Sequence, residues 1–504
     1  MKRYIIIVAA CLLAGCGKFL EESSQNELRP NNVNDLQQLI IGEAYPLSWE
    51  NAVLPPYFLS YIELMTDNVE NNPVNEETFS QGLAPMNSGE GPFTWRFDMY
   101  EAMGEAGVSR VDTYEHYYRR IKGCNVVLEE LEEITGGVAD KARLRGEALA
   151  LRAYYYFMLV NLYGQPYNAP GVDVNTALGV PLVLSSSASD VYPTRATVGA
   201  VYASVEKDLL EAAPLLERYG QTKSRFKVTN LFAYHLLSRV YLYMEQWPRA
   251  IAYADSVIDR RPGLLNLATL AMPTGANNAN VVNVYSPTSP EVIWTFSRAT
   301  GTNTGECYSF YYLYPASSTM LPPYTVSSDL MNLYDYDPTF LTNDADLRPR
   351  MFYTKYTYPL AGQYVVHYGN KFGSFNDQLG GKGMRVAEAY LNRAEAYIQT
   401  GKQQEALRDL NTLRRHRYAD GYADVQLSAI PDLLTFCLEE RRRELSFEEH
   451  RWFDLRRHGM PAIKHTYHGE VTQAAREVTI PPERYVLPFS REVLDKNPSL
   501  IPNP

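Results

Sequence analysis

The sequence predicts a mainly α-helical protein with one large loop-rich insertion, and three observations lead to this fold class. Residues 384–417 place apolar and small side chains at helical spacing in two successive segments. Residues 230–262 repeat that pattern. Between these copies, residues 264–383 lose the pattern and become rich in aromatic residues, because residues 285–368 contain 13 of the 39 tyrosines, about twice an even share.

Each copy of the pattern predicts a helix hairpin. In the C-terminal copy, Ala394 and Ala406 are the small residues expected where two helices approach closely, and Gly401 ends the first helix. Aligning Ser238 with Ala394 places Ala250 on Ala406, which supports the hairpin independently. These positions resemble the tetratricopeptide repeat. Because the copies lie 156 residues apart (394 − 238), we expect a helical scaffold with one inserted region rather than an uninterrupted solenoid.

The N-terminus has the pattern of a secretory signal peptide. Lys2 and Arg3 precede an apolar run that is too short to span a bilayer, and small residues then lead to Cys16. This arrangement resembles the bacterial lipobox, in which the chain is cut before a diacylated cysteine. We therefore expect residues 1–15 to be removed, Cys16 to carry the lipid, and residues 16–34 to form a polar tether. An uncleaved signal anchor is the alternative.

The charge and the remaining cysteines exclude several classes of protein. Loss of Lys2 and Arg3 changes the formal charge from −11 to about −13 (−11 − 2), and such an acidic chain is a poor partner for nucleic acid. Cys124, Cys307 and Cys437 are far apart and odd in number. They match neither a zinc pattern nor a complete disulfide framework, so we expect buried free thiols.

Further helices and loops follow from the same periodicity. We expect helices at residues 35–42, 59–65, 114–133, 144–162, 197–216 and 438–458. The stripe in residues 144–162 indicates a core helix, and we interpret the Tyr154-Tyr155-Tyr156 triplet within it as packing. Residues 66–91 are rich in Asn, Glu, Gly, Ser and Pro, which predicts a loop.

The domain organisation follows from these elements. About 490 residues exceed the usual size of a single core, but interleaved repeats can share one. We therefore expect one body over residues 35–504, with a helical scaffold at about 35–262 and 384–504. The insertion, at about 263–383, should carry short strands or extended segments at residues 281–285 and 291–297.

The tyrosines of the insertion suit a binding surface. Tyr308, Tyr311 and Tyr312 belong to a stretch in which many tyrosines lie beside Gly, Pro, Ser or Asn, which is typical of loops rather than of core periodicity. Aromatic rings on loops offer flat apolar faces with polar edges, which suit the C–H faces of sugars or the side chains of a peptide. The alternative is that these rings hold the loop against the helices.

Catalytic motifs are missing from the sequence. The acidic pairs Glu439-Glu440 and Glu448-Glu449 are adjacent residues in an arginine-rich helix, so we interpret them as ion-paired rather than as the separated carboxylates of a glycosidase. His465 and His468 lack an HExxH motif or another ligand cluster. Neither a phosphate-binding glycine loop nor a GxSxG elbow occurs. We therefore expect no enzyme.

We expect no cofactor, although one group of acids in the insertion suits calcium. Hard cations take several carboxylate and carbonyl oxygens, and four aspartates lie close together in the sequence: Asp335, Asp337, Asp344 and Asp346. We favour the alternative interpretation, in which they are solvated turn residues.

Three segments resemble the SusD/RagB family of surface nutrient-binding lipoproteins. They are RGEALALRAYYYFMLVNLYG at residues 145–164, ERRRELSFEEHRWFDLRR at residues 440–457 and the terminal YVLPFSREVLDKNPSLIPNP. The lipobox, both hairpins and the position of the aromatic insertion agree with the same family. The resemblance therefore covers essentially the whole chain.

The resemblance implies a SusD-like helical fold, a lipid-anchored location on the outer membrane facing outward, and a SusC-like TonB-dependent transporter as partner. Such a lipoprotein caps the transporter and helps to deliver oligosaccharides, or peptides in some relatives, without bond chemistry. A repeat scaffold that docks other envelope proteins is the alternative from another class.

Ligand residues vary too much within the family to be carried over, so we select aromatic residues of the expected loops as candidates: Trp95, Tyr100, Tyr308, Tyr311 and Tyr312. Three of the five tryptophans, Trp247, Trp294 and Trp452, lie in segments that we interpret as structural, which leaves Trp49 and Trp95 for a binding platform.

Overall fold

The computed structural model describes residues 30–46, 61–72, 83–107, 113–187, 189–270, 284–296, 323–336, 345–358, 364–369, 371, 382–469 and 474–503. The predicted signal peptide, Cys16, Trp49, Cys307 and the candidates Tyr308, Tyr311 and Tyr312 lie outside these residues. None of the helices in the described part of the chain combines the length and the apolar character needed to cross a bilayer.

The described chain is mainly helical, as the sequence predicts. The N-terminal part contains α2 (Val33–Leu39), the π-helical turn η2 (Ile40–Ala44), the 3-10 helix η3 (Ile62–Met65), α4 (Leu83–Phe93), α5 (Met99–Glu105), α6 (Thr113–Glu133), α7 (Val138–Tyr163), α8 (Val198–Tyr219), α9 (Asn230–Tyr243) and α10 (Trp247–Arg260). After the insertion follow α13 (Val386–Gln399), α14 (Gln403–Arg415), η7 (Leu427–Ala429), α15 (Leu433–Leu445), α16 (Arg451–Arg457), η8 (Pro482–Tyr485) and α17 (Arg491–Lys496).

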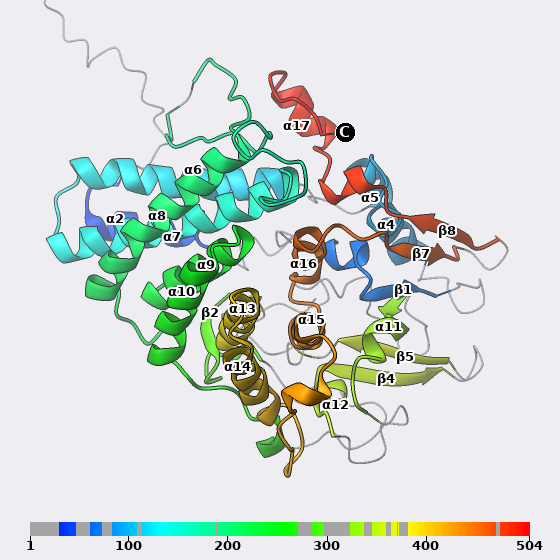
Figure 1. Ribbon diagram of the computed structural model, residues 1–504. Coiled ribbons are helices and arrows are strands. Elements are labelled where there is room, and N and C mark those ends of the chain that lie inside the picture. Colours follow the sequence, from blue (N-terminus) through cyan, green and yellow to red (C-terminus); the bar gives the residue numbers. More distant parts are fainter. Residues whose placement is uncertain are drawn as a thin grey trace, which may run out of the picture.

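Strands occur only as antiparallel pairs among the described residues. The pairs are β1 (Val69–Asn71) with β3 (Tyr324–Val326), β2 (Val292–Phe296) with β6 (Lys382–Arg385), β4 (Tyr353–Tyr358) with β5 (Tyr364–Gly369), and β7 (Lys464–Tyr467) with β8 (Arg476–Thr479). The insertion also contains η4 (Leu267–Thr269), α11 (Ser328–Met331) and α12 (Arg348–Phe352). Figure 1 shows α6 to α10 on one side, α13 to α16 in the middle and three of the strand pairs opposite.

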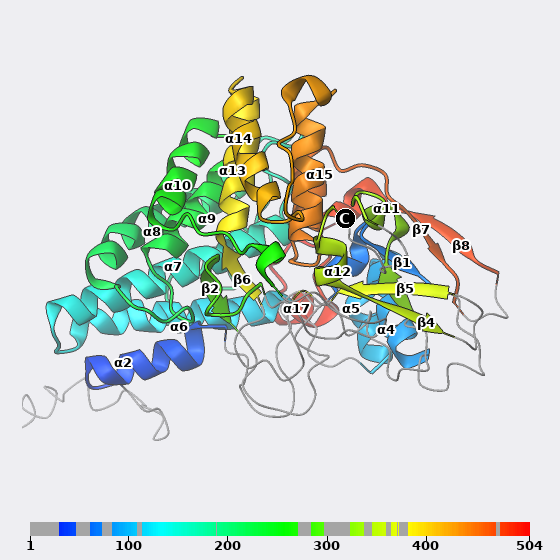
Figure 2. The ribbon, with the colours of Figure 1, turned by 90° about the horizontal axis from the view of Figure 1, so that it is seen from below.

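Both predicted hairpins are present. Gly401 has a φ of +76° at the turn between α13 and α14, a conformation that glycine adopts without steric cost. Ser238, Ala250, Ala394 and Ala406 are fully buried, so the small residues lie where the helices approach each other. The two hairpins pack together through α10 and α13, although they are far apart in sequence (Figure 2).

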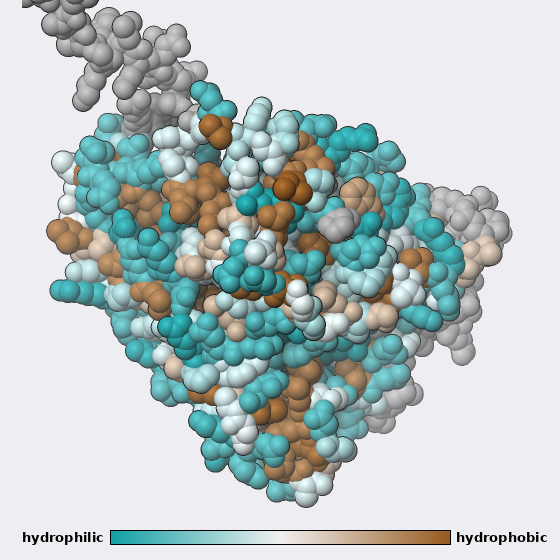
Figure 3. Space-filling model, turned by 45° about the horizontal axis from the view of Figure 1, so that its top comes forward, coloured by the Kyte–Doolittle hydropathy of each residue, from teal (hydrophilic) through white to brown (hydrophobic). Residues whose placement is uncertain are grey.

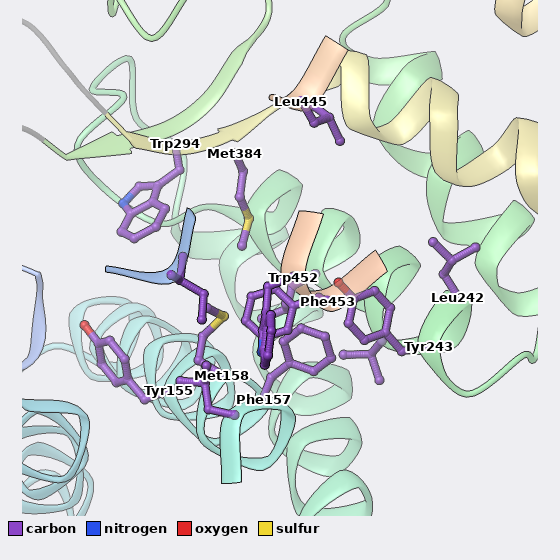
Figure 4. Packing of buried hydrophobic residues seen from close by; sticks show 14 of the residues in the cluster. Tyr155, Phe157, Met158, Leu242, Tyr243, Trp294, Met384, Leu445, Trp452 and Phe453 are labelled. Carbon is purple, nitrogen blue, oxygen red and sulfur yellow. The ribbon is translucent and has the colours of Figure 1, made fainter. Parts of the chain in front are cut away.

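Helix α7 is the centre of the helical scaffold. Apart from the half-buried Tyr154, every residue from Gly146 to Tyr163 is buried, because α6 and α8 cover it from both sides. The hydroxyl of Tyr156 donates to the carbonyl of Val183 at 2.7 Å, which confirms the packing role of this part of the tyrosine triplet. Side chains of α7, α9, β2, β6 and α16 meet in one apolar core, which Figure 4 shows at Phe157, Trp294 and Trp452.

Three sequence predictions differ from the structure. The expected loop at residues 66–91 contains β1 and most of α4, because tertiary packing overrides its glycine-rich composition. Gly89 is needed there, since a Cβ atom would lie 2.4 Å from the ring of Tyr324. The expected helix at residues 59–65 is only the 3-10 turn η3 in its described part, and Val284 and Tyr285 form a turn rather than a strand.

The expected single helix at residues 438–458 is also wrong. It divides into α15 and α16, which are separated by residues 446–450. Phe447 and Glu449 have positive φ angles of 61° and 66°, which no α-helix contains. The physical reason is that the break turns Glu448 towards Arg385, whose Nη2 lies 2.6 Å from its carboxylate.

The predicted ion pairing of the acidic residues is confirmed, but most partners lie on other elements. We define the buried arginine–glutamate cluster as the following side chains, each less than 10% exposed: Glu291, Asp346, Arg348, Lys371, Arg385, Arg414, Arg417, Glu440, Arg443, Glu444 and Glu448. Arg385 contacts Glu291 at 2.9 Å and Glu444 at 2.6 Å. Arg417, after α14, contacts the same two glutamates. The cluster therefore joins the insertion to α14 and α15.

The described cysteines are free. Cys124 and Cys437 are buried thiols without a disulfide, as predicted. Burial raises the pKa of both thiols well above its usual value. Both thiols therefore remain protonated and unreactive at neutral pH.

A matched pair of adjacent glutamates tests the importance of the cluster. Glu440 is fully buried and contacts Arg348 at 2.7 Å and Arg414 at 2.6 Å, whereas Glu439 is 41% exposed and reaches only Arg443 at 3.4 Å. We expect Glu440→Gln to lower the free energy of unfolding by about 3 kcal/mol, because it leaves the buried guanidinium of Arg414 without its carboxylate and removes one carboxylate from Arg348. Glu439→Gln should change it by less than about 1 kcal/mol. Denaturant titration at pH 7 measures both values.

The pH dependence of this difference provides a further check. Burial raises the pKa of Glu440, but Arg348, Arg414 and Arg443 outweigh burial and lower it to about 2. The stabilisation is therefore complete above the ordinary value of 4.5 and is lost as the pH falls towards 2. Equal stabilities of the two variants at pH 7 would contradict the assigned role of the cluster.

Candidate ligand-binding region

Two segments that lie outside the described residues are bordered by residues that contact each other. The backbone N–H of Asn72, after β1, donates to the carbonyl of Pro323 at 2.8 Å, and the side-chain amide of Asn71 donates to the same oxygen at 2.8 Å. Residues 73–82 begin beside this contact, and residues 297–322, which include Tyr308, Tyr311 and Tyr312, end there. The fold therefore brings together the ends of two segments that are more than 200 residues apart in sequence.

Helix α4 packs against the start of β3. Tyr324, the first residue of β3, packs its ring against Gly89 and Phe93 and donates its hydroxyl to the carbonyl of Met86 at 2.8 Å. The ring is fully buried. The start of β3, which follows residues 297–322 in the sequence, is therefore held against α4.

Trp95 belongs to a stack of three buried rings. Its indole stacks on the imidazole of His465 with ring centres 4.3 Å apart, and Phe93 stacks on the same imidazole at 4.1 Å. The indole Nε1 donates to the carbonyl of Met65 at 3.0 Å. A φ of 52° at Trp95 directs the ring inward after the end of α4. The stack therefore connects η3, α4 and β7.

His465 lies between two backbone carbonyls. Its Nδ1 is 2.7 Å from the oxygen of Phe93, and its Nε2 is 3.0 Å from the oxygen of Thr66. Burial lowers the pKa of the imidazole, and the two carbonyls oppose that effect. Because a neutral ring has one N–H, it can donate to only one of them. With both nitrogens facing oxygens of the protein, His465 is not arranged as a metal ligand.

Tyr100, on α5, lies in a chain of buried hydroxyl groups. Its hydroxyl is 2.8 Å from that of Tyr61 and 3.0 Å from that of Tyr163, and Tyr61 also contacts Thr113 at 2.8 Å. The ring of Tyr100 is 4% exposed. Its polar edge and its faces are therefore both in contact with the protein.

The burial of Trp95 and Tyr100 differs from the open loop positions that we expected for them. Composition alone suggested a loop before both residues, whereas α4, α5 and β7 form and pack around the rings. Neither ring offers a free face in this structure. Their assignment as ligand residues stays a prediction, and Tyr308, Tyr311 and Tyr312 lie outside the described residues.

Phe97 is an exposed aromatic residue in this region. Its side chain is 48% exposed, and the guanidinium of Arg484 lies 4.9 Å from the ring centre. The neighbouring Arg96 and Asp98 pair with each other across it. In the sequence, Phe97 stands alone between Arg96 and Asp98. An aromatic residue between opposite charges favours a solvent-facing turn.

Glu63 is a buried acid beneath the same region. It lies on η3, is 1% exposed, and accepts a hydrogen bond from the backbone N–H of Glu449 at 2.8 Å. No cation forms an ion pair with it among the described residues. Burial is the main cause that raises its pKa to about 7.

This raised pKa predicts how stability changes with pH. The folded state holds the proton of Glu63 more tightly than the unfolded state, whose pKa is about 4.5. Stability therefore falls as the pH rises from 4.5 through 7, by up to about 3 kcal/mol. We expect Glu63→Gln to be more stable than the wild type at pH 8 and equal to it at pH 4.5. Urea titration at both values checks this, and an equal difference at both would refute it.

Of the four aspartates that the sequence raised as calcium candidates, Asp346 has another role in the described structure. Asp346 is fully buried and pairs with Arg348 at 2.7 Å, so its carboxylate is not available for calcium. Asp335 is exposed, and Asp337 and Asp344 lie outside the described residues. Within the described part of the chain, no group of three or more His, Cys, Asp or Glu residues suits a metal ion.

Comparison with known families decides the relationship of the chain. A SusD-like family model, described as "Starch-binding associating with outer membrane", matches residues 18–242, and the SusD family model matches residues 294–504. The chain belongs to the SusD/RagB family. No match was found among curated proteins.

Solved SusD-like structures share the fold along nearly the whole chain. A SusD superfamily protein from Bacteroides thetaiotaomicron is 24% identical, with a TM-score of 0.71, and the match covers 94% of this chain and 100% of that one. A SusD-like carbohydrate binding protein from Bacteroides vulgatus is 22% identical, with a TM-score of 0.65 and coverage of 94% and 98%. Another Bacteroides vulgatus protein is 24% identical, with a TM-score of 0.69 and coverage of 95% and 99%.

Proposed function

We propose that this SusD-like protein is a non-catalytic surface lipoprotein that binds oligosaccharide or polysaccharide nutrients and delivers them to a SusC-like TonB-dependent transporter of the outer membrane. The observation that carries the proposal is the match of SusD family models to both halves of the chain. The matching family is described as starch-binding, and one structural relative is a carbohydrate binding protein. Glycan binding is therefore the first activity to test.

We place the ligand site at the surface beside α4 and the Asn72–Pro323 contact. Within the described residues, a cavity of about 30 Å³ lies among Tyr154, Lys382 and Glu449, and such a volume holds water rather than a sugar ring. Several tyrosines belong to residues 297–322, which come directly before Pro323 in the sequence, and Phe97 is an exposed ring between α4 and α5. Such rings suit the C–H faces of sugars.

Lipid anchoring is the second part of the proposal. Diacylated Cys16 would hold the protein at the outer membrane, because each buried methylene contributes about 0.8 kcal/mol and two or more chains give stable attachment. The residues between Cys16 and the start of α2 at Val33 would then separate the folded body from the lipid surface.

Binding by the chain that starts after Cys16 tests ligand capture. We expect saturable binding to at least one member of a panel of plant, host and microbial polysaccharides. Phe97→Ala and Tyr311→Ala should each weaken it about tenfold, since loss of one stacking ring costs roughly 1 to 2 kcal/mol. Isothermal titration calorimetry on the hit measures the affinity, and circular dichroism confirms that each variant is folded.

A matched control and the contrary outcomes make this test specific. Tyr397→Ala removes a partly exposed ring at the far end of α13 and should leave affinity unchanged. Trp95→Ala is a poor probe by itself, because loss of its stack with His465 destabilises the fold. Binding only to peptide digests would replace the glycan by a peptide ligand. Binding to neither class would oppose the capture role and favour a scaffold that docks envelope proteins.

The lipid anchor and the transporter require a separate experiment in cells. We expect the full chain to fractionate with outer membranes and to co-purify with a TonB-dependent transporter after mild detergent extraction. Cys16→Ser should move the protein out of the membrane fraction, because the acylated thiol is lost. A Cys16→Ser protein that stays in the membrane fraction would contradict lipidation at this residue, and purification without a transporter would contradict the partnership.

A further inference from the structure

Arg456 is a buried cation without an acidic partner. The residue lies on α16 and is 2% exposed. One of its N–H groups, at Nη2, donates to the carbonyl of Gly164, which follows α7. Its Nε is buried and has no partner within the described chain, and no described carboxylate forms an ion pair with it.

The adjacent residue shows what a compensated arginine looks like at this position. Arg457 contacts Glu395 at 2.8 Å and Asp454 at 2.9 Å. Both arginines are buried, but only Arg457 has counter-charges. The two arginines therefore differ in their ionic partners and not in their degree of burial.

An uncompensated guanidinium is costly in this environment. Burial lowers the pKa of Arg456 to about 10, so the group is still charged at neutral pH. Taking such a charge out of water is strongly unfavourable unless another charge or hydrogen bonds replace the water. The single carbonyl of Gly164 uses one of five N–H groups. The remaining donors need an acceptor.

Arg456 lines a small cavity. Its volume is about 20 Å³, and its lining contains Arg456, Asn161, Tyr167, Asn168 and Tyr202. That volume suits one water molecule or one ion of similar size. The hydroxyl of Tyr202 donates to Asn161 at 2.9 Å, so this polar pair is already satisfied.

The charged side chains around the cavity differ in how far their charge is neutralised or screened. Arg457 also lines it, but its charge is neutralised by Glu395 and Asp454. Glu245 is the one carboxylate in the lining, and its side chain is exposed. Water screens the charge of Glu245 far more than that of the buried Arg456. The local excess of charge inside the cavity is therefore positive.

We propose that this cavity binds one chloride ion, which accepts hydrogen bonds from the guanidinium of Arg456. The ion supplies the missing counter-charge, fits the small volume, and joins α16 to the end of α7. This site is separate from the proposed glycan site and does not depend on the proposed function.

Crystals that contain sodium bromide test occupancy directly. We expect an anomalous difference peak for bromide next to the guanidinium of Arg456. Wild-type protein should also melt at least about 1 °C higher in sodium chloride than in sodium gluconate of equal ionic strength, because an ion that binds only the folded state stabilises it. Gluconate is too large for the cavity and serves as the reference anion.

Two variants connect the effect to this residue. Arg456→Gln should abolish the difference between chloride and gluconate, whereas Arg249→Gln, which removes an arginine that is 52% exposed, should retain it. If Arg456→Gln does not fold, the bromide crystal of the wild type still decides. The absence of a bromide peak at Arg456, or equal melting of the wild type in both salts, would overturn the proposal.

Discussion

The buried arginine–glutamate cluster is the interaction on which the rest of the structure depends. Charges that leave water lose several kcal/mol each, and they are tolerated only when opposite charges and hydrogen bonds surround them. Here Arg385 contacts three glutamates, and Arg348 and Arg417 share Glu444 between them. The carboxylates come from the insertion, from α15 and from the segment after it. Those three parts of the chain must therefore meet in one arrangement before any of the charges is compensated.

The same cluster positions the candidate ligand-binding region. Glu448 can reach Arg385 only because the chain leaves the helical conformation after α15, and the backbone N–H of Glu449 then donates to Glu63 on η3. The chain continues through α16 to β7, where His465 stacks between Phe93 and Trp95. Figure 3 shows apolar residues on one face as several separate patches among hydrophilic ones.

Helices with strong periodicity were predictable from local sequence, and segments held by distant contacts were not. The α9–α10 and α13–α14 hairpins could be recognised from the sequence, because the small residues Ala250 and Ala406 indicate where two helices approach closely. By contrast, α4 contains Gly89, Gly91 and Pro92, which locally disfavour a helix. It forms because Tyr324, more than 200 residues away, packs against Gly89. The burial of the aromatic candidates was unpredictable for the same reason, since the neighbouring residues in the sequence do not reveal which ring distant segments will bury.

The sequence by itself determined the family, the helical class, the hairpins, the ion pairing of the glutamates and the thiol state of Cys124 and Cys437, because each depends on residue type and on spacing along the chain. Only the tertiary structure decided where the helix after residue 438 breaks, that Trp95 and Tyr100 are buried, and that Asn72 contacts Pro323. Those features depend on contacts between segments that are far apart in the sequence. Ion pairs and stacked rings release their free energy only when both partners are brought together, and no local pattern encodes the partner.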